Sequence, residues 1–193
     1  MNKILIALVV IIVFIISFIT SKYNGLVTRD EQVKTAWAQV ENQYQRRLDL
    51  IPNLVATVKW FASQEQEVLI GVTEARANAT KMNIDITDAQ QFAEFQQAQG
   101  QLSSALSRLL AVVENYPDLK SNQNFLELQA QLEGTENRIT VERSKYNEIV
   151  KDYNTYVRIF PTSIVAGMFW FNRAELFSAT TGADTPPTVD FSK

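Results

Sequence analysis

The chain has 193 residues, of which 46% are hydrophobic and 20% are charged, and its formal net charge is -3. This balance excludes a disordered acidic chain and argues against a basic nucleic-acid-binding protein, so we expect no nucleic-acid partner. The sequence contains no Cys and no His, which excludes disulfides, Cys/His zinc sites, thiol nucleophiles and every catalytic scheme that needs an imidazole.

The first segment is strongly apolar. Residues 4–20 read ILIALVVIIVFIISFIT and carry no charge. As a helix they would span about 25 Å, at the short end of the range that crosses a bilayer. A cleaved signal peptide is the alternative, but Ile19 and Ser21 fit a small-residue cleavage site poorly. We therefore expect a retained transmembrane anchor over residues 1–22.

The charges on either side of this segment leave its orientation open. Lys3 lies on the amino side, and Lys22, Arg29 and Lys34 lie on the carboxyl side. The excess of basic residues slightly favours a cytoplasmic carboxyl-terminal domain. A charged N-terminal amine would nearly remove that excess, so the side of the membrane stays undecided.

Apolar residues recur at alternating three- and four-residue spacing from Val33 to Ala79. This pattern is typical of a long amphipathic helix, which we expect to begin near Thr28 or Arg29. Pro52 lies inside it and should kink it. Because the spacing keeps its phase across Pro52, we expect one bent helix up to residue 79.

Two further long helices are predicted. Thr87 to Gln90 resembles a capping box ahead of the second helix, whose apolar positions run from Phe92 to Tyr116. Ser121 or Asn122 can cap the third, which continues to Phe160 and stops at Pro161. Short connections predict that consecutive helices run antiparallel. One or two short helices should follow within residues 162–177.

The predicted fold is all-α, an elongated antiparallel bundle of three long helices plus a short C-terminal helical segment, preceded by one N-terminal transmembrane helix. We expect an anchor at 1–22, the bundle at 23–180 and an extended tail at 181–193. The second helix is much shorter than the first, so part of the first needs another cover. The third helix, the C-terminal segment and further copies of the chain are the candidates.

Long strings of this sequence resemble the LemA family of bacteria. They are AWAQVENQYQRRLDLIPNLVATVKWFA (36–62), ALSRLLAVVENYPDLKSNQNFLELQAQLEGTENRI (105–139) and the pairs Tyr146-Asn147 and Tyr153-Asn154. The resemblance implies a single N-terminal membrane segment, an antiparallel helical bundle and no established catalytic activity, and it places the chain in the bacterial inner membrane. The region of Trp170 departs from the family, whose C-terminal segment is often Gly-rich.

Arg47 is the most informative charged residue, because it occupies an apolar position of the first helix within a polar string that includes Asp49 and Asn53. A buried guanidinium needs a carboxylate partner. The candidates on the third helix are Glu133, Glu136 and Glu142. We favour an inter-helix ion pair beside a solvated face; a recognition patch or anion site is the alternative.

Gly134 lies inside the third helix, where glycine costs about 1 kcal/mol relative to Ala. A close approach of two helices near the Pro52 kink would justify it. A small ligand niche there, formed by Asn53, Glu136, Asn137 and Arg138, is a second interpretation. We favour a polar lock without a ligand.

The aromatic residues of the third helix, including Tyr146 and Tyr153, have the spacing of core residues. Asn147 and Asn154 are one heptad apart and can form repeated inter-helix hydrogen bonds. The run at residues 164–171 could contact the membrane, form a self-association patch or end the core, and we take core as the default.

These patterns predict a membrane-anchored, non-enzymatic helical scaffold or interaction protein that self-associates and has an unidentified protein partner. We expect no catalytic residue, cofactor or metal. The alternative is a ligand-sensing or enzymatic bundle that uses the Arg47/Glu136/Asn137 region, and the aromatic run leaves a lipid-remodelling role as a third interpretation. The structural or interaction candidates are Arg47, Asp49, Pro52, Asn53, Glu133, Gly134, Glu136, Asn137, Arg138, Tyr146, Tyr153 and Arg158.

Overall fold

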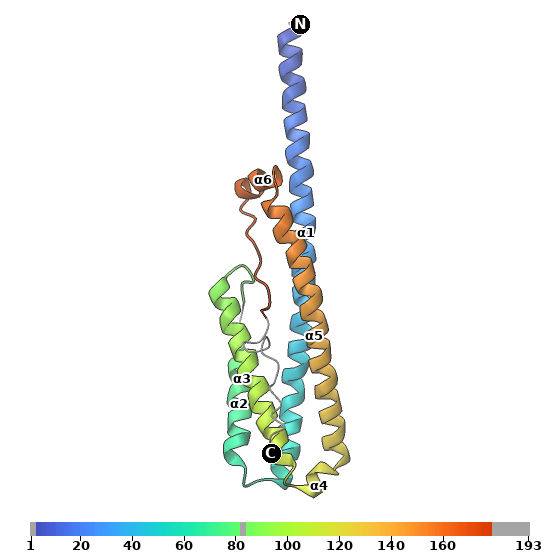
Figure 1. The fold of residues 1–193 in the computed structure, drawn as a ribbon, viewed down its shortest axis with the longest axis vertical. Helices are drawn as coiled ribbons and strands as arrows, with labels where there is room; N and C mark the ends of the chain where they lie inside the picture. The colour runs from blue at the N-terminus through green and yellow to red at the C-terminus, as the bar shows by residue number, and fades with distance from the viewer. Residues whose placement is uncertain (1–2, 82–83, 179–193) are drawn as a thin grey trace, which may run out of the picture.

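The computed structural model describes residues 3–81 and 84–178, and all regular secondary structure in these ranges is α-helical. The helices are α1 (Lys3–Phe61), α2 (Gln66–Thr80), α3 (Ala89–Val113), α4 (Pro117–Lys120), α5 (Gln123–Arg158) and α6 (Thr162–Met168). Figure 1 shows α1, α2, α3 and α5 running alternately down and up, with the N-terminal part of α1 projecting beyond the others. The predicted all-α class is confirmed. The extended tail predicted at 181–193 lies outside the described residues.

α1 is one unbroken helix of 59 residues that joins the apolar segment directly to the bundle. The separate helix start predicted near Thr28 or Arg29 is wrong, because no residue between 20 and 30 interrupts the helix. Among the described residues, α1 is the helix long and apolar enough to cross a membrane, and none of its most apolar stretch is buried against the chain. The predicted boundary between anchor and bundle therefore falls within a continuous helix.

The predicted extension of the first helix to residue 79 is also wrong. α1 ends at Phe61, and the chain reverses through residues 62–65 into α2. The buried Ala62 still donates its N–H to Val58 O at 2.8 Å, so the turn grows out of the last turn of α1. Both helices face one core, and the short turn preserves the apolar spacing, which therefore cannot distinguish a hairpin from a bent helix. Pro52 lies on the exposed side of α1.

Side-chain caps fix the starts of α3 and α5. Asp88, one residue later than the predicted Thr87, caps α3: its Oδ1 accepts from the backbone N–H of Gln90 at 2.9 Å and of Gln91 at 3.1 Å. Asn122 caps α5 by accepting a hydrogen bond from the first turn, as predicted. Each cap satisfies backbone donors that a helix start leaves without a partner.

The core consists of two clusters stacked along the bundle. The upper cluster, nearer the projecting end of α1 in Figure 1, is rich in aromatic residues, including Trp37, Phe92, Tyr146 and Phe177. The lower cluster is mainly aliphatic, with residues of α1, α2, α3 and α5. Above α3, α1 is covered by α5, α6 and the segment that follows α6. These are the third long helix and the C-terminal segment, the two covers within the chain that we predicted from the helix lengths.

Residues 171–178, which we call the C-terminal strap, run back along α5 in an extended conformation. The side-chain amide of Asn154 donates to Ala174 O at 2.8 Å and accepts from Ala174 N at 3.0 Å. Asn147 pairs with Phe177 in the same way, at 2.9 Å in both directions. The tyrosine before each asparagine also donates to the strap backbone, at 3.0 Å and 2.7 Å. The repeated hydrogen bonds predicted for the two asparagines therefore exist, but their partner is an extended strap instead of a helix.

Candidate functional site

Arg47 lies in α1 at the boundary between the two core clusters, one turn below Tyr44 of the upper cluster and directly before Leu48 of the lower one. Arg47 is only 1% exposed. An unpaired charge at such a depth would be very costly, so the surrounding side chains must neutralise it.

Two helices, α3 and α5, supply acceptors for this guanidinium. Nη1 donates to Glu136 Oε1 of α5 at 2.7 Å and to Ser103 Oγ of α3 at 3.0 Å. Nη2 donates to Gln99 Oε1 of α3. We call Arg47, Gln99, Ser103 and Glu136 the Arg47 layer. Of the three carboxylates that the sequence offered as partners, the structure selects Glu136.

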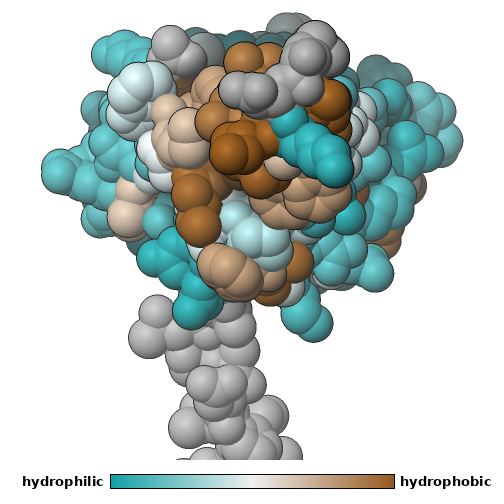
Figure 2. Space-filling model, turned by 90° about the horizontal axis from the view of Figure 1, so that it is seen from above, coloured by the Kyte–Doolittle hydropathy of each residue, from teal (hydrophilic) through white to brown (hydrophobic). Residues whose placement is uncertain are grey.

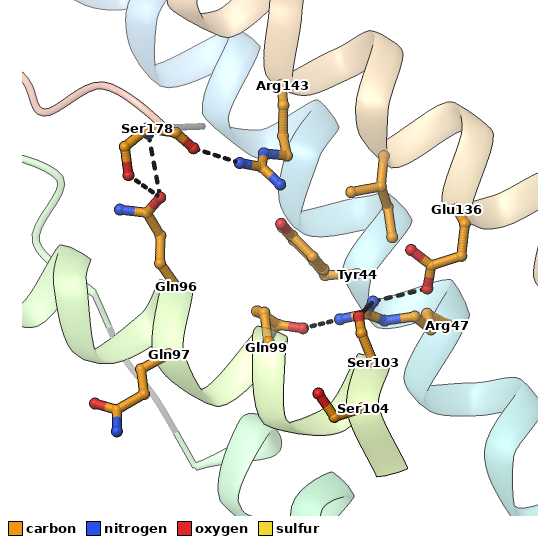
Figure 3. A pocket seen from close by; sticks show the side chains of 12 residues that line it. Tyr44, Arg47, Gln96, Gln97, Gln99, Ser103, Ser104, Glu136, Arg143 and Ser178 are labelled. Carbon is orange, nitrogen blue, oxygen red and sulfur yellow. Dashed lines mark hydrogen bonds and ion pairs between the residues drawn. The ribbon is translucent and has the colours of Figure 1, made fainter. Parts of the chain in front are cut away.

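A cavity of about 530 Å³ opens beside the Arg47 layer. Figure 3 shows side chains from α1, α3, α5 and the C-terminal strap turned toward it. Arg143 donates to Ser178 O at 3.2 Å, and Gln96 Oε1 accepts from both Ser178 N and Ser178 Oγ at 3.2 Å. The strap therefore forms part of the rim, held by hydrogen bonds to two helices.

The electrostatics of the cavity favour negative charge. Arg47 and Arg143 both line it, against the single carboxylate of Glu136. Burial raises the pKa of the Tyr44 phenol, so this hydroxyl remains a neutral donor. Arg47 Nε is buried and has no hydrogen-bond partner among the described residues. Among residues 3–81 and 84–178, no group of three or more acidic side chains is placed to hold a metal ion.

The other predicted residues of α1 lie on the surface. Asp49 is exposed and accepts a hydrogen bond from Gln45 at 2.8 Å. Asn53 lines a separate hollow with residues 124–131 of α5, away from the Arg47 layer. The niche predicted near Pro52 is therefore not assembled.

The predicted residues in the middle of α5 divide into two groups. Glu136 joins the Arg47 layer, and Asn137 lines a neighbouring hollow that shares Ser103 and Glu136 with the main cavity. Glu133 and Arg138 are exposed. A Cβ on Gly134 would have nothing within 4 Å, so the close helix approach predicted there is wrong.

The close approach occurs at Gly25 instead, where a Cβ would lie 2.5 Å from Tyr156 Oη. Tyr146 and Tyr153 are buried, as expected of core residues. Burial raises the pKa of both phenols, that of Tyr153 to about 12. Arg158 is exposed at the end of α5.

Sequence reasoning missed Gln99, Ser103 and Arg143. Gln99 had a usable signal, because it is the one polar residue among the apolar positions of its helix, as Arg47 is a charged one in the first. Two polar residues that each break an apolar series are natural partners, since each needs a buried hydrogen bond. Ser103 and Arg143 carried no comparable signal.

Comparison with known proteins supplies the family. Residues 36–191 match the LemA family. The magnetosome proteins MamQ 1 and MamQ 2 of Paramagnetospirillum magneticum are each 26% identical to this chain, over 93% of it and 74% of their own length. Protein LemA of Metamycoplasma hominis is 22% identical over 81% of this chain and 69% of its own. The matched region contains the Arg47 layer, the strap and every part of the bundle from residue 36 onward. Because the match covers most of the sequence, the chain belongs to the LemA family.

Proposed function

We propose that this protein is a membrane-anchored, non-enzymatic helical scaffold of the bacterial inner membrane, which self-associates and presents its bundle to a protein partner. The observation that carries the proposal is the continuity of α1. The apolar segment and the bundle share one helix from Lys3 to Phe61, so the bundle is held at a fixed angle to its anchor without a flexible linker.

The same continuity supports retention of the anchor. A signal-peptide cut near residues 19–21 would fall inside α1, where Ile19 already packs against the upper core cluster. Cleavage there would remove Ile19, a residue that the folded bundle uses in its packing.

A scaffold role also agrees with how the charged groups around the main cavity are used. Arg47 is bonded to Glu136, and Arg143 to the strap backbone. These groups join helices and strap together, which is the work of structural residues, whereas a catalytic acid or base must be free to exchange a proton with a substrate.

Self-association is supported by apolar side chains at the end of the bundle opposite the anchor. Trp60 is 85% exposed and Ile70 is 55% exposed. Ile70, with Val55 and Leu69, lines a groove of about 450 Å³ between α1 and α2. A second copy offers the same exposed side chains and the same groove, which is the condition for a self-complementary contact.

The test is the mass of the full-length protein in a mild detergent, measured by light scattering with the detergent contribution subtracted. We expect an oligomer, which the double variant Trp60→Ser/Ile70→Ser shifts toward monomer. Val141→Ser, at a 51% exposed residue of α5, is the matched control and should leave the mass unchanged. A monomer at high protein concentration contradicts self-association. Capture of the intact protein from its own membrane then identifies the partner.

A ligand-sensing role for the cavity is the second candidate, because Arg47 Nε is buried without a partner among the described residues beside a space of about 530 Å³. Here Glu136→Gln and Asn137→Ala should change the response to a ligand while the melting temperature stays nearly constant. A loss of several kcal/mol of stability in the Glu136 variant instead assigns this residue to a structural lock.

The side of the membrane is tested by labelling. The native chain has no thiol, so a single cysteine at the exposed Gln64, in the turn after α1, reports alone. Labelling of intact cells by an impermeant maleimide places the bundle outside, and labelling only after lysis places it inside.

A further inference from the structure

The end of the bundle beside the apolar segment carries exposed hydrophobic side chains that the core does not use. We call them the α6 patch: Ile159, Phe160, Ile164, Met168, Phe169 and Trp170. Phe160 is 81% exposed and Trp170 is 84% exposed. Figure 2 looks onto this end along α1, so the projecting apolar part of α1 points toward the viewer in the middle of the face, with hydrophilic residues toward the rim.

The α6 patch lies at the level where the apolar segment ends. Tyr23 of α1 contacts Phe169, with ring centroids 4.8 Å apart. It follows Thr20 by three residues, or roughly 4.5 Å along the helix. Ile19, inside the apolar segment, already packs against the upper cluster. A bilayer that contains residues 4–20 must therefore pass within a few ångströms of the patch.

Trp170 has a backbone conformation that supports an outward role. Its φ angle is 54°, in the left-handed region that bulky residues disfavour. Phe169 and Phe171 on either side both contact Tyr23. The conformation directs these two rings toward Tyr23, Phe169 remaining 42% exposed, while the indole points away from them and is 84% exposed. Such strain is typical of functional positions.

The two stretches of chain nearest the patch carry basic residues, and one of them, Arg29, shares a hollow with Asp152. Residues 18–29 contain Lys22 and Arg29, residues 158–174 contain Arg158 and Arg173, and neither stretch contains Asp or Glu. Aromatic side chains with basic neighbours are typical of the headgroup region of bilayers, where indole rings sit at the interface and cations meet anionic lipids.

We propose that the α6 patch docks onto the bilayer that holds the anchor, with Trp170 and Phe160 at the boundary between headgroups and acyl chains and the basic residues facing anionic headgroups. The inference rests on the membrane anchoring proposed above and is independent of self-association. The occupant is a lipid surface, because a protein partner at this level would have to displace the lipid around the anchor. The protein is thus attached at two points, which fixes the tilt of the bundle.

The experiment uses the full chain in vesicles of phosphatidylcholine and phosphatidylglycerol. Trp37 is buried and common to all samples, so the Trp60→Phe variant reports on Trp170. The variant Trp60→Phe/Trp170→Phe/Val141→Trp, with its indole at a 51% exposed position of α5 away from the proposed self-association contact, is the exposed reference. Vesicle flotation first establishes insertion, which separates failure of the anchor from failure of the patch. Lipids brominated near the headgroup then serve as the quencher in the membrane, and acrylamide as the quencher in water.

We expect Trp170 to be blue-shifted, quenched by brominated lipid and severalfold less accessible to acrylamide than the indole introduced by Val141→Trp. In the Arg158→Gln/Arg173→Gln variant the protection of Trp170 should fall in anionic vesicles and stay unchanged in neutral ones. Equal acrylamide quenching of Trp170 and of the indole introduced by Val141→Trp in floated vesicles overturns the proposal. Protection of Trp170 without quenching by brominated lipid also overturns it, because the cover is then protein.

Discussion

The replacement Arg47→Met tests whether the Arg47 layer is a structural lock. Methionine retains much of the side-chain volume but leaves Gln99, only 6% exposed, without its donor. A buried acceptor without a partner costs about 1–3 kcal/mol. The Glu136 side chain is 42% exposed, so water replaces the guanidinium there and adds little to the loss. The expected loss of about 2 kcal/mol lowers the melting temperature by about 4–8 °C in a chain of this size.

The decisive variant is Arg47→Met/Gln99→Leu, which removes donor and acceptor together. Replacing a buried polar pair by apolar groups of similar size is nearly neutral. Gln99→Leu alone strips an acceptor from a buried charge, so it should cost about 2 kcal/mol. Thermal unfolding of the full-length protein in one detergent, followed by far-UV circular dichroism, should therefore give a double variant more stable than either single one. Losses that simply add refute the coupled layer.

Four further substitutions test the close approach at Gly25, the open space at Gly134, the pairing of the strap and the burial of Tyr153. Gly25→Ala places a Cβ against Tyr156 Oη and should destabilise the protein by about 1–3 kcal/mol. Gly134 has open space around it, so Gly134→Ala should stabilise the protein by up to about 1 kcal/mol. The melting temperature of each variant measures the change. Asn154→Ala removes two hydrogen bonds to the strap, and we expect a loss of about 2 kcal/mol of stability. Hydrogen exchange of the strap amides should accelerate. Unchanged exchange would show that the pairing does not hold the strap. Burial raises the pKa of Tyr153 from 10 to about 12, so the folded state favours the neutral phenol. The contribution of this phenol to the free energy of unfolding is therefore full below pH 10 and is lost as the pH rises to 12. The loss of stability over this pH range should be shallower in Tyr153→Phe.

The sequence was sufficient to predict the helical class and the core, because apolar spacing depends only on which face of a helix is buried. Val33, Trp37 and Tyr44 were placed correctly for this reason. It failed at residues 62–65, where a four-residue turn lets the spacing continue in phase into a helix of opposite direction. Spacing carries no information on direction, and the turn contains neither Gly nor Pro to mark it.

The candidate site was predictable where a residue contradicted its own helix. Arg47 at an apolar position required a carboxylate, and Glu136 was among those expected. Gly134 was misleading because a glycine in a helix implies a close approach only if another element happens to face it, and here none does. The partners of Asn147 and Asn154 could not be inferred either, since an extended strap has no periodicity and becomes visible only once α6 has turned the chain back.

The strap connects the two features to which we assign roles. It begins at the aromatic residues beside the anchor and ends at Ser178 on the rim of the cavity near the Arg47 layer. Asn147 and Asn154 bind strap residues three apart, so the strap cannot slide by one residue without breaking both pairings. If α6 is displaced at the bilayer surface, there are therefore two cases. Either the pairings along the strap hold it in place, or the whole strap moves and Ser178 leaves the rim of the cavity. Asn154→Ala separates these cases, because only in the second does the exchange of Ser178 rise with that of Ala174.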